Sequence, residues 1–289
     1  MKIGAVCLSL SCMDFTEVLN FVKEIGGETI ELCTVEGAHN GTLDLRKMQR
    51  SSLLATVKSH GLSITSVAGY NDFTFASDDV ELNQQVKKLE WYCELAADLQ
   101  VGLVRVMSGD FRPDLTKEEM VTNIIRGFKI AVKMAKEYNV VLALENHGLL
   151  VNDAPTLIRI VETVADERLR LTLDTGNFCW AGHSLQETDS YFQQVAPYVA
   201  NVHLKDLVFT DPKKVQFVPL GQGDLDLKMV VAQLAAVGYD GALLCEYEGM
   251  GDPKELLQAG AFTREKFMQG LKDGTRQSLT HLKTLFRCN

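Results

Sequence analysis

The sequence contains no run of basic residues longer than a Lys-Lys pair, and its net charge at neutral pH is −9. A nucleic-acid groove needs clustered Lys and Arg to neutralise phosphates, so this composition disfavours a nucleic-acid partner. The longest apolar runs also fall well short of the roughly 20 residues that a membrane span requires. We therefore expect neither nucleic acid nor a membrane among the partners of this protein.

Signals for cysteine pairing are absent as well. The seven cysteines are scattered, odd in number and include no CxxC pair. Disulfide frameworks and thiolate metal sites both need an ordered spacing. We interpret the cysteines as reduced thiols of a cytoplasmic protein, and the opening MKIGAVCLSLSC as a first β-strand rather than a signal peptide.

Linkers, low-complexity segments and shifts in composition are missing throughout, which predicts a single domain over residues 1–289. Short β-rich runs alternate with longer stretches such as DFTEVLNFVKEIG, in which apolar residues recur every three or four positions. That spacing is typical of helices packed on one face. Several of these stretches stop at a residue type that commonly ends a helix, at Gly26, Gly61, Asn139 and Gly238.

Eight β-rich runs are expected to be strands. They are residues 2–9, 29–33, 63–68, 103–107, 140–145, 170–174, 200–203 and 242–246. Eight strands, each followed by a helix, predict a closed (β/α)₈ TIM barrel. An open doubly wound sheet is the weaker alternative, because the sequence lacks a GxGxxG motif. The tail over 254–289 is longer than one helix needs, and we expect it beneath the barrel or on a neighbouring subunit of a homo-oligomer.

Four consecutive expected strands end in a polar residue. The fifth ends at Glu145 in ALENHG, the sixth at Asp174 in LTLDTGN, the seventh at His203 in NVHLKD and the eighth at Glu246 in LLCEYEG. Catalytic groups of such a barrel lie at the C-terminal ends of its strands. Each of the four follows a short, mostly apolar run, so we expect them at one depth around a single axis.

Three adjacent carboxylates repel one another unless a cation lies between them. A solvated residue at a strand end would explain any one of the four, but four in succession favour a metal site. Three carboxylates and one imidazole suit Mn²⁺, Mg²⁺ or Co²⁺ better than they suit a closed structural zinc site. We predict one divalent ion, with Mn²⁺ preferred and Zn²⁺ also open, and with room for two substrate oxygens.

The series LEN, LDTGN, VHLKD, GxGD and EYEG, with IGAVCLS and ETIELC before it, resembles the xylose isomerase-like barrel superfamily. That superfamily comprises sugar and sugar-phosphate isomerases and epimerases, including ketose 3-epimerases, inosose dehydratase, hydroxypyruvate isomerase and, more distantly, endonuclease IV. The resemblance covers nearly the whole chain. It implies a carbohydrate substrate, the metal ligands Glu145, Asp174, His203 and Glu246, and proton transfer by Glu145 and Glu246.

The sequence departs from the epimerase pattern at one position. Epimerases often carry His three residues after the aspartate of strand six, where this chain has Asn177. An amide can bind a substrate hydroxyl but cannot transfer a proton at neutral pH. His147, two residues after Glu145, is a candidate second acid or base if the extended chain continues. A histidine that only orients its loop is the equal alternative.

Other polar and aromatic residues are candidates for substrate contact. Lys205 follows His203 by two residues and could bind an anionic substrate group, or pair with Asp206. Trp180, with Phe178, could form a wall beside a sugar ring, and His39 in EGAHNG could reach the site from the loop after strand two. Plain packing and loop structure are the alternatives for these three.

Two further features have open interpretations. Glu31 alternates inward on strand two, where it could bind the substrate or pair with Arg105 of strand four. The segment PLGQGDLD, residues 219–226, could hold a phosphate on its amides. Capping of the next helix by Asp224 explains that segment equally well.

The residues together predict a divalent-metal-dependent isomerase or epimerase of a ketose or related polyhydroxy carbonyl compound. The ion polarises the carbonyl, Glu246 or Glu145 removes the neighbouring proton, and an enediolate forms. Loss of a β-oxygen from the same intermediate would instead give a dehydratase or β-eliminating lyase. Weaker alternatives are an endonuclease IV-like nuclease, which needs more metal ligands, and a non-catalytic sugar-binding barrel.

Overall fold

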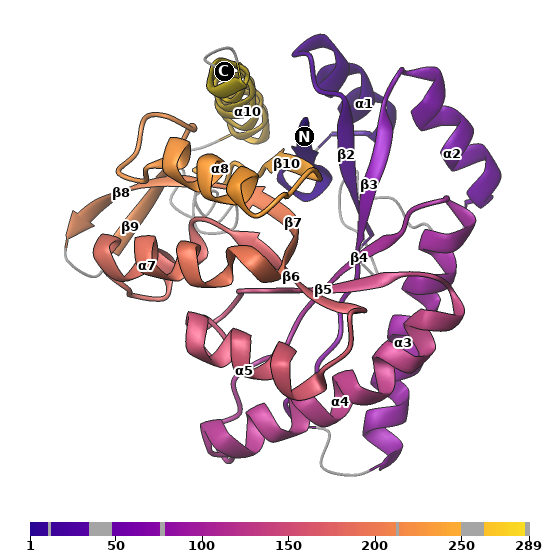
Figure 1. Ribbon diagram of the computed structural model, residues 1–289. Helices are drawn as coiled ribbons and strands as arrows, with labels where there is room; N and C mark the ends of the chain where they lie inside the picture. Colours follow the sequence, from indigo (N-terminus) through magenta and orange to yellow (C-terminus); the bar gives the residue numbers. More distant parts are fainter. Residues whose placement is uncertain (11–12, 35–47, 76–78, 212–213, 250–262, 287–289) are drawn as a thin grey trace.

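The computed structural model describes residues 1–10, 13–34, 48–75, 79–211, 214–249 and 263–286. Eight parallel strands close into a barrel in the order β1-β10-β7-β6-β5-β4-β3-β2 (Figure 1). These strands are β1 (Lys2–Val6), β2 (Thr29–Cys33), β3 (Ser63–Ala68), β4 (Leu103–Val106), β5 (Val141–Glu145), β6 (Leu169–Asp174), β7 (Val199–Leu204) and β10 (Ala242–Cys245). The predicted (β/α)₈ barrel is therefore confirmed.

Helices surround the barrel and cover its outer face (Figure 1). The longer ones are α1 (Phe15–Glu24), α2 (Arg50–Ser59), α3 (Asp79–Asp98), α4 (Lys117–Glu137), α5 (Ala154–Val164), α7 (Leu185–Val195), α8 (Leu227–Ala236) and α10 (Arg264–Phe286). Shorter elements are η1 (Cys7–Leu10), α6 (Asn177–Trp180) and η2 (Ala196–Tyr198). None of the helices in the described segments combines the length and the apolar character that a membrane span requires.

The barrel strands are buried on both faces, as a parallel sheet covered by helices requires. Every residue of β2 and of β10 is buried, and so is all of β5 after its first residue. Apolar residues fill most of this interior, but the C-terminal ends of the strands carry the buried charged side chains. The fold thus concentrates its buried charge at one end of the barrel.

Most strand boundaries agree with the sequence prediction to within one residue. The exception is the end of the first strand. The first ends at Val6 rather than at residue 9, because Cys7–Leu10 turns into the short helix η1. The seventh is longer than expected and runs from Val199 to Leu204, so His203 lies one residue before its end.

The predicted helix exits are confirmed. Gly26, Gly61, Asn139 and Gly238 all have positive φ, the left-handed conformation that commonly ends a helix. Gln100 and Ala165 adopt the same conformation, which their residue types did not reveal. Both are side-chain-bearing residues in a region that L-residues rarely occupy.

An antiparallel hairpin, β8 (Asp206–Asp211) and β9 (Lys214–Val218), follows β7 and was not expected from the sequence. The next loop is the PLGQGDLD segment. Its Gly221 and Gly223 amides donate to Asp206 Oδ2 at 2.8 and 2.9 Å, so this carboxylate already occupies the expected phosphate donors. The proposed cap was also wrong, because Asp226 rather than Asp224 caps α8 by accepting from the Met229 amide.

The C-terminal tail does not lie beneath the barrel. Helix α10 packs against β1 and β10 and takes its place in the outer ring between α8 and α1 (Figure 1). Leu279 and Leu282 are buried in this contact, and Lys283 Nζ donates to the Ile25 carbonyl at 2.7 Å. The part of the tail over 254–262 lies outside the described residues, and a homo-oligomer stays a prediction.

The left-handed residue at the end of α5 gives a test of local strain. Ala165 is exposed and has φ 53°, so Ala165→Gly removes strain without removing packing. We expect a gain of about 1 kcal/mol in the free energy of unfolding, or roughly 2–4 °C in Tm for a chain of this size. The matched control is Ala232→Gly at an exposed position inside α8, where the same change should cost about 1 kcal/mol. Chemical denaturation measures the free energy of unfolding of both variants. A loss of stability in both would show that the left-handed conformation of Ala165 stores no strain.

Candidate metal centre

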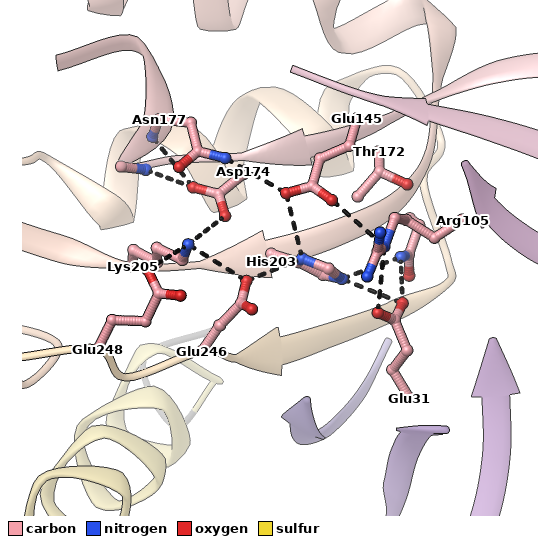
Figure 2. A network of polar contacts seen from close by, with 12 residues as sticks. Glu31, Arg105, Glu145, Thr172, Asp174, Asn177, His203, Lys205, Glu246 and Glu248 are labelled. Atoms are coloured by element: carbon pink, nitrogen blue, oxygen red, sulfur yellow. Dashed lines mark hydrogen bonds and ion pairs between the residues drawn. The ribbon is translucent and has the colours of Figure 1, made fainter. Parts of the chain in front are cut away.

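Four side chains from neighbouring strands converge at the C-terminal end of the barrel. Glu145 ends β5, Asp174 ends β6, His203 lies near the end of β7, and Glu246 directly follows β10. One potential ligand atom from each lies within 4.8 Å of those of the other three, and all four residues are buried. The structure therefore brings together the four residues that the sequence singled out (Figure 2).

Three of these side chains leave a buried atom without a hydrogen-bond partner. The atoms are Asp174 Oδ2, His203 Nδ1 and Glu246 Oε2. His203 Nδ1 lies 3.0 Å from Glu246 Oε2 and 3.9 Å from Glu145 Oε1. Buried polar atoms in proteins are nearly always hydrogen-bonded. Here the Lys205 ammonium lies 3.2 and 3.4 Å from the two carboxylate oxygens, so these atoms face positive charge without a well-formed hydrogen bond, as the ligands of a cation site do.

The surrounding residues orient the two carboxylates of β5 and β6. Asp174 Oδ1 accepts from the backbone amides of Gly176 and Asn177 at 2.9 and 3.1 Å, which leaves Oδ2 facing the centre. Glu145 Oε1 accepts from Asn177 Nδ2 at 3.2 Å, and its Oε2 lies 3.3 Å from Arg105 Nε. Asn177 thus contacts both acids rather than standing apart from them.

The cluster carries more buried negative charge than positive charge. Its buried carboxylates are Glu31, Glu145, Asp174 and Glu246, whereas its buried cations are Arg105 and Lys205. With a neutral His203, two negative charges remain uncompensated. Burying an unpaired charge is costly, and a divalent ion supplies the missing charge. Three carboxylates and an imidazole are also donors that Mn²⁺, Mg²⁺, Co²⁺ and Zn²⁺ accept.

The protonation of the cluster reflects the same charge excess. Burial raises the pKa of Asp174 to about 7. Burial would also raise the pKa of Glu246, but Lys205 and His203 outweigh it and hold that pKa well below its usual range. Burial would lower the pKa of His203, but the carboxylates of Glu31 and Glu246 raise it well above its ordinary value. Without an ion, Asp174 and His203 are therefore the two groups that take up protons near neutral pH.

Lys205 lies inside the cluster and not against Asp206. Its Nζ is 3.2 Å from Asp174 Oδ2, 3.4 Å from Glu246 Oε2 and 2.8 Å from Glu248 Oε2 (Figure 2). The expected alternative, a pair with Asp206, is wrong because that carboxylate accepts from backbone amides. The side chain of Glu248 is partly exposed but reaches back to Lys205.

The remaining candidates lie farther from the centre. His147 is exposed, and its ring stacks on that of Trp180 with 6.5 Å between ring centroids. The strand ends at Glu145, so the inward alternation expected for His147 does not continue. Trp180 is 47% exposed, whereas Phe178 is fully buried and packs on Tyr191 and Phe192. His39 lies outside the described residues.

The contact between Glu31 and His203 was not predicted from the sequence. Glu31 of β2 lies near Arg105, as one alternative proposed, with 3.7 Å between Oε1 and Nε. Its other oxygen, however, contacts His203 Nε2 at 3.0 Å across the barrel. Inward alternation on β2 and β7 was the available signal, but alternation does not give the distance between two strands that are not adjacent.

The model of the xylose isomerase-like TIM barrel family matches residues 19–283. The chain belongs to this family. Two curated relatives match most of the chain at low identity. An uncharacterized protein of Methanocaldococcus jannaschii is 24% identical over 89% of this chain and 88% of its own length. The inosose dehydratase of Geobacillus thermodenitrificans is 26% identical over 84% of this chain and 92% of its own length.

Solved structures of other xylose isomerase-like barrels share the fold. The IOLI protein, whose structure contains a zinc atom, superposes with a TM-score of 0.76 at 20% identity and covers 97% of this chain and 99% of its own. D-psicose 3-epimerase from Clostridium cellulolyticum H10, solved with D-tagatose, has a TM-score of 0.77 at 16% identity, with 99% of each chain covered. At these identities the likeness concerns the barrel and not the reaction.

The convergence of ligand atoms predicts that each chain binds one divalent ion. Elemental analysis of protein incubated with Mn²⁺ and then desalted should find about one ion per chain in wild type and much less in Asp174→Ala. The control is Asp153→Ala, because that carboxylate caps α5 and lies outside the cluster. Equal metal content in wild type and Asp174→Ala would contradict the assignment.

The protonation of the ion-free centre predicts that metal affinity rises with pH. Burial raises the pKa of Asp174 to about 7, and the carboxylates of Glu31 and Glu246 raise the pKa of His203 well above its ordinary value. Both groups must therefore lose protons before they can bind an ion. We expect Mn²⁺ affinity to increase by about tenfold per pH unit or more from pH 6 to pH 8. Calorimetry in buffers of different ionisation enthalpy should also show proton release. A Mn²⁺ affinity that does not change over this pH range would show that protons and the ion do not compete for Asp174 and His203.

Proposed function

We propose that this member of the xylose isomerase-like TIM barrel family is a divalent-metal-dependent isomerase or epimerase of a ketose or related polyhydroxy carbonyl compound. The proposal rests mainly on the placement of two carboxylates. Glu145 belongs to β5 and Glu246 follows β10, and β6 and β7 separate these strands in the barrel. The two acids therefore approach one central space from different sides, as transfer of a proton between two faces of a substrate requires.

The ion would polarise the substrate carbonyl and thereby acidify the neighbouring C–H bond. Glu145 and Glu246 would both hold the ion and transfer protons to or from the substrate. Glu246 is a candidate for the first base in its ionised form, because Lys205 and His203 hold its pKa well below the usual range. Arg105 and Asn177 hold the Glu145 carboxyl group in place. In its protonated form Glu145 could donate a proton of its own to the opposite face or to the adjacent carbon, while Glu246 keeps the proton it removed.

Substrate contacts complete the proposal. Asn177, at the edge of the cluster, can hydrogen-bond a hydroxyl, and Lys205 can neutralise charge that develops on a substrate oxygen. The stacked rings of His147 and Trp180 offer an exposed surface for a sugar ring, with His147 as a second acid or base. His39 stays a candidate from the loop after β2. We keep Mn²⁺ as the expected ion and a cytoplasmic location as a prediction.

β-Elimination of water is the second candidate, and the position of Lys205 favours it. Its buried ammonium lies 3.2 Å from Asp174 Oδ2 and 3.4 Å from Glu246 Oε2, close to the base that would remove the proton. When Glu246 takes the α-proton, the β-C–O bond breaks and Lys205 protonates the departing hydroxide to water. The similarity to an inosose dehydratase along most of its length also supports this candidate.

Solvent exchange tests the shared first step. In D₂O with Mn²⁺ and a panel of ketoses and inososes, the true substrate should gain deuterium beside its carbonyl, as NMR detects. Glu246→Gln keeps an oxygen that can coordinate but loses the base, so exchange should fall by about 10²–10⁴-fold. Glu28→Gln at the opposite end of β2 is the matched control and should exchange like wild type.

The products of the same experiment separate the two candidates. An isomerase or epimerase returns a deuterated sugar of unchanged composition, whereas a lyase returns a product that has lost water. Exchange that survives Glu246→Gln but disappears in His147→Ala would move the base to His147. Turnover without deuterium at any carbon would reject proton abstraction altogether.

A further inference from the structure

One buried carboxylate beside the centre has no role in the proposed chemistry. Glu31 of β2 is fully buried, and three donors converge on its Oε2. They are Ser66 Oγ at 2.7 Å, Asn201 Nδ2 at 2.9 Å and His203 Nε2 at 3.0 Å. The other oxygen, Oε1, lies 3.7 Å from Arg105 Nε. An oxygen that serves three donors beside a guanidinium acts as an acceptor only.

This arrangement decides which ring nitrogen of His203 carries a proton. Nε2 lies 3.0 Å from an oxygen that only accepts, so a bare lone pair on Nε2 would face a carboxylate. Asn201 Nδ2 is 3.3 Å from Nε2, farther than its 2.9 Å to Glu31 Oε2. The charged carboxylate, at 3.0 Å from Nε2, is therefore the stronger partner of that ring nitrogen. The two nitrogens are neighbouring donors to one acceptor. In the neutral ring, the lone pair is therefore on Nδ1, the atom that faces Glu145 and Glu246.

We infer that Glu31 is a positioning residue that fixes the Nε2–H tautomer of His203, so that Nδ1 is the atom presented to the ion. The inference rests on the metal centre proposed above. Glu31 is not one of the four ligands, and its direct contact with them is the one to the imidazole ring. Its other oxygen faces Arg105, which also contacts Glu145. Such partners of metal-binding histidines fix the ring orientation and increase ligand basicity. A buried ion pair is weak evidence for stability, which favours this role over a purely structural one.

Metal affinity tests the inference without relying on turnover. Glu31→Gln keeps the length of the side chain but removes the charge that holds the Nε2 proton. We expect its affinity for Cd²⁺, measured by calorimetry, to fall by about 10–100-fold. Ser66→Ala is the matched control, because it removes another donor to the same oxygen and leaves the carboxylate and His203 in place. It should lose less than a few-fold in affinity.

A spectroscopic measurement on wild type makes the test independent of any variant. In protein with ¹⁵N-labelled histidine and bound ¹¹³Cd²⁺, the metal-coupled nitrogen of His203 should be Nδ1, while Nε2 retains its proton. Coupling through Nε2, or a Glu31→Gln variant that binds Cd²⁺ as tightly as wild type, would reject the role of Glu31 and leave the metal centre standing. Wild type that binds no Cd²⁺ would reject the centre and this role with it.

Discussion

Uncompensated negative charge, buried at the C-terminal end of the barrel, is the constraint on which the rest of the site depends. Four buried carboxylates face two buried cations, and three potential ligand atoms have no hydrogen-bond partner. In a low-dielectric interior such a cluster must gain a cation or protons. The raised pKa of Asp174 reflects the uptake of protons. The convergence of oxygen and nitrogen atoms on one point favours the uptake of a cation.

The barrel delivers these groups because all eight strands run in one direction, so their C-terminal ends surround a single space. Local contacts then decide which atom of each side chain faces that space. Backbone amides occupy one oxygen of Asp174, Arg105 approaches one oxygen of Glu145, and Glu31 occupies one nitrogen of His203. Each of these contacts leaves a second atom for the centre. Orientation thus comes from a surrounding layer of polar residues, which is as buried as the ligands themselves.

Proton abstraction beside a carbonyl is common to isomerisation, epimerisation and β-elimination, so one cluster of residues suits all three reactions. Their difference lies in where the proton goes next and whether a C–O bond breaks. Glu145 and Glu246, on separated strands, suit return of a proton to another position. Lys205, buried against Asp174 and Glu246, suits protonation of a leaving oxygen. The loop with Gly221 and Gly223 takes no part as a phosphate site, since Asp206 occupies its amides.

The sequence by itself determined the eight barrel strands, their order and the four polar strand ends, because apolar periodicity, helix-ending residues and local motifs extend over only a few residues. It also placed Glu145, Asp174, His203 and Glu246 at one depth. Only the tertiary structure decided the contact of Glu31 with His203, the position of Lys205 among three carboxylates, and the place of α10 in the outer ring. Each of these joins residues from elements that are far apart in the chain or not adjacent in the barrel. The β8–β9 hairpin and the turn of His147 away from the interior depend on where β7 and β5 end, which periodicity alone does not fix.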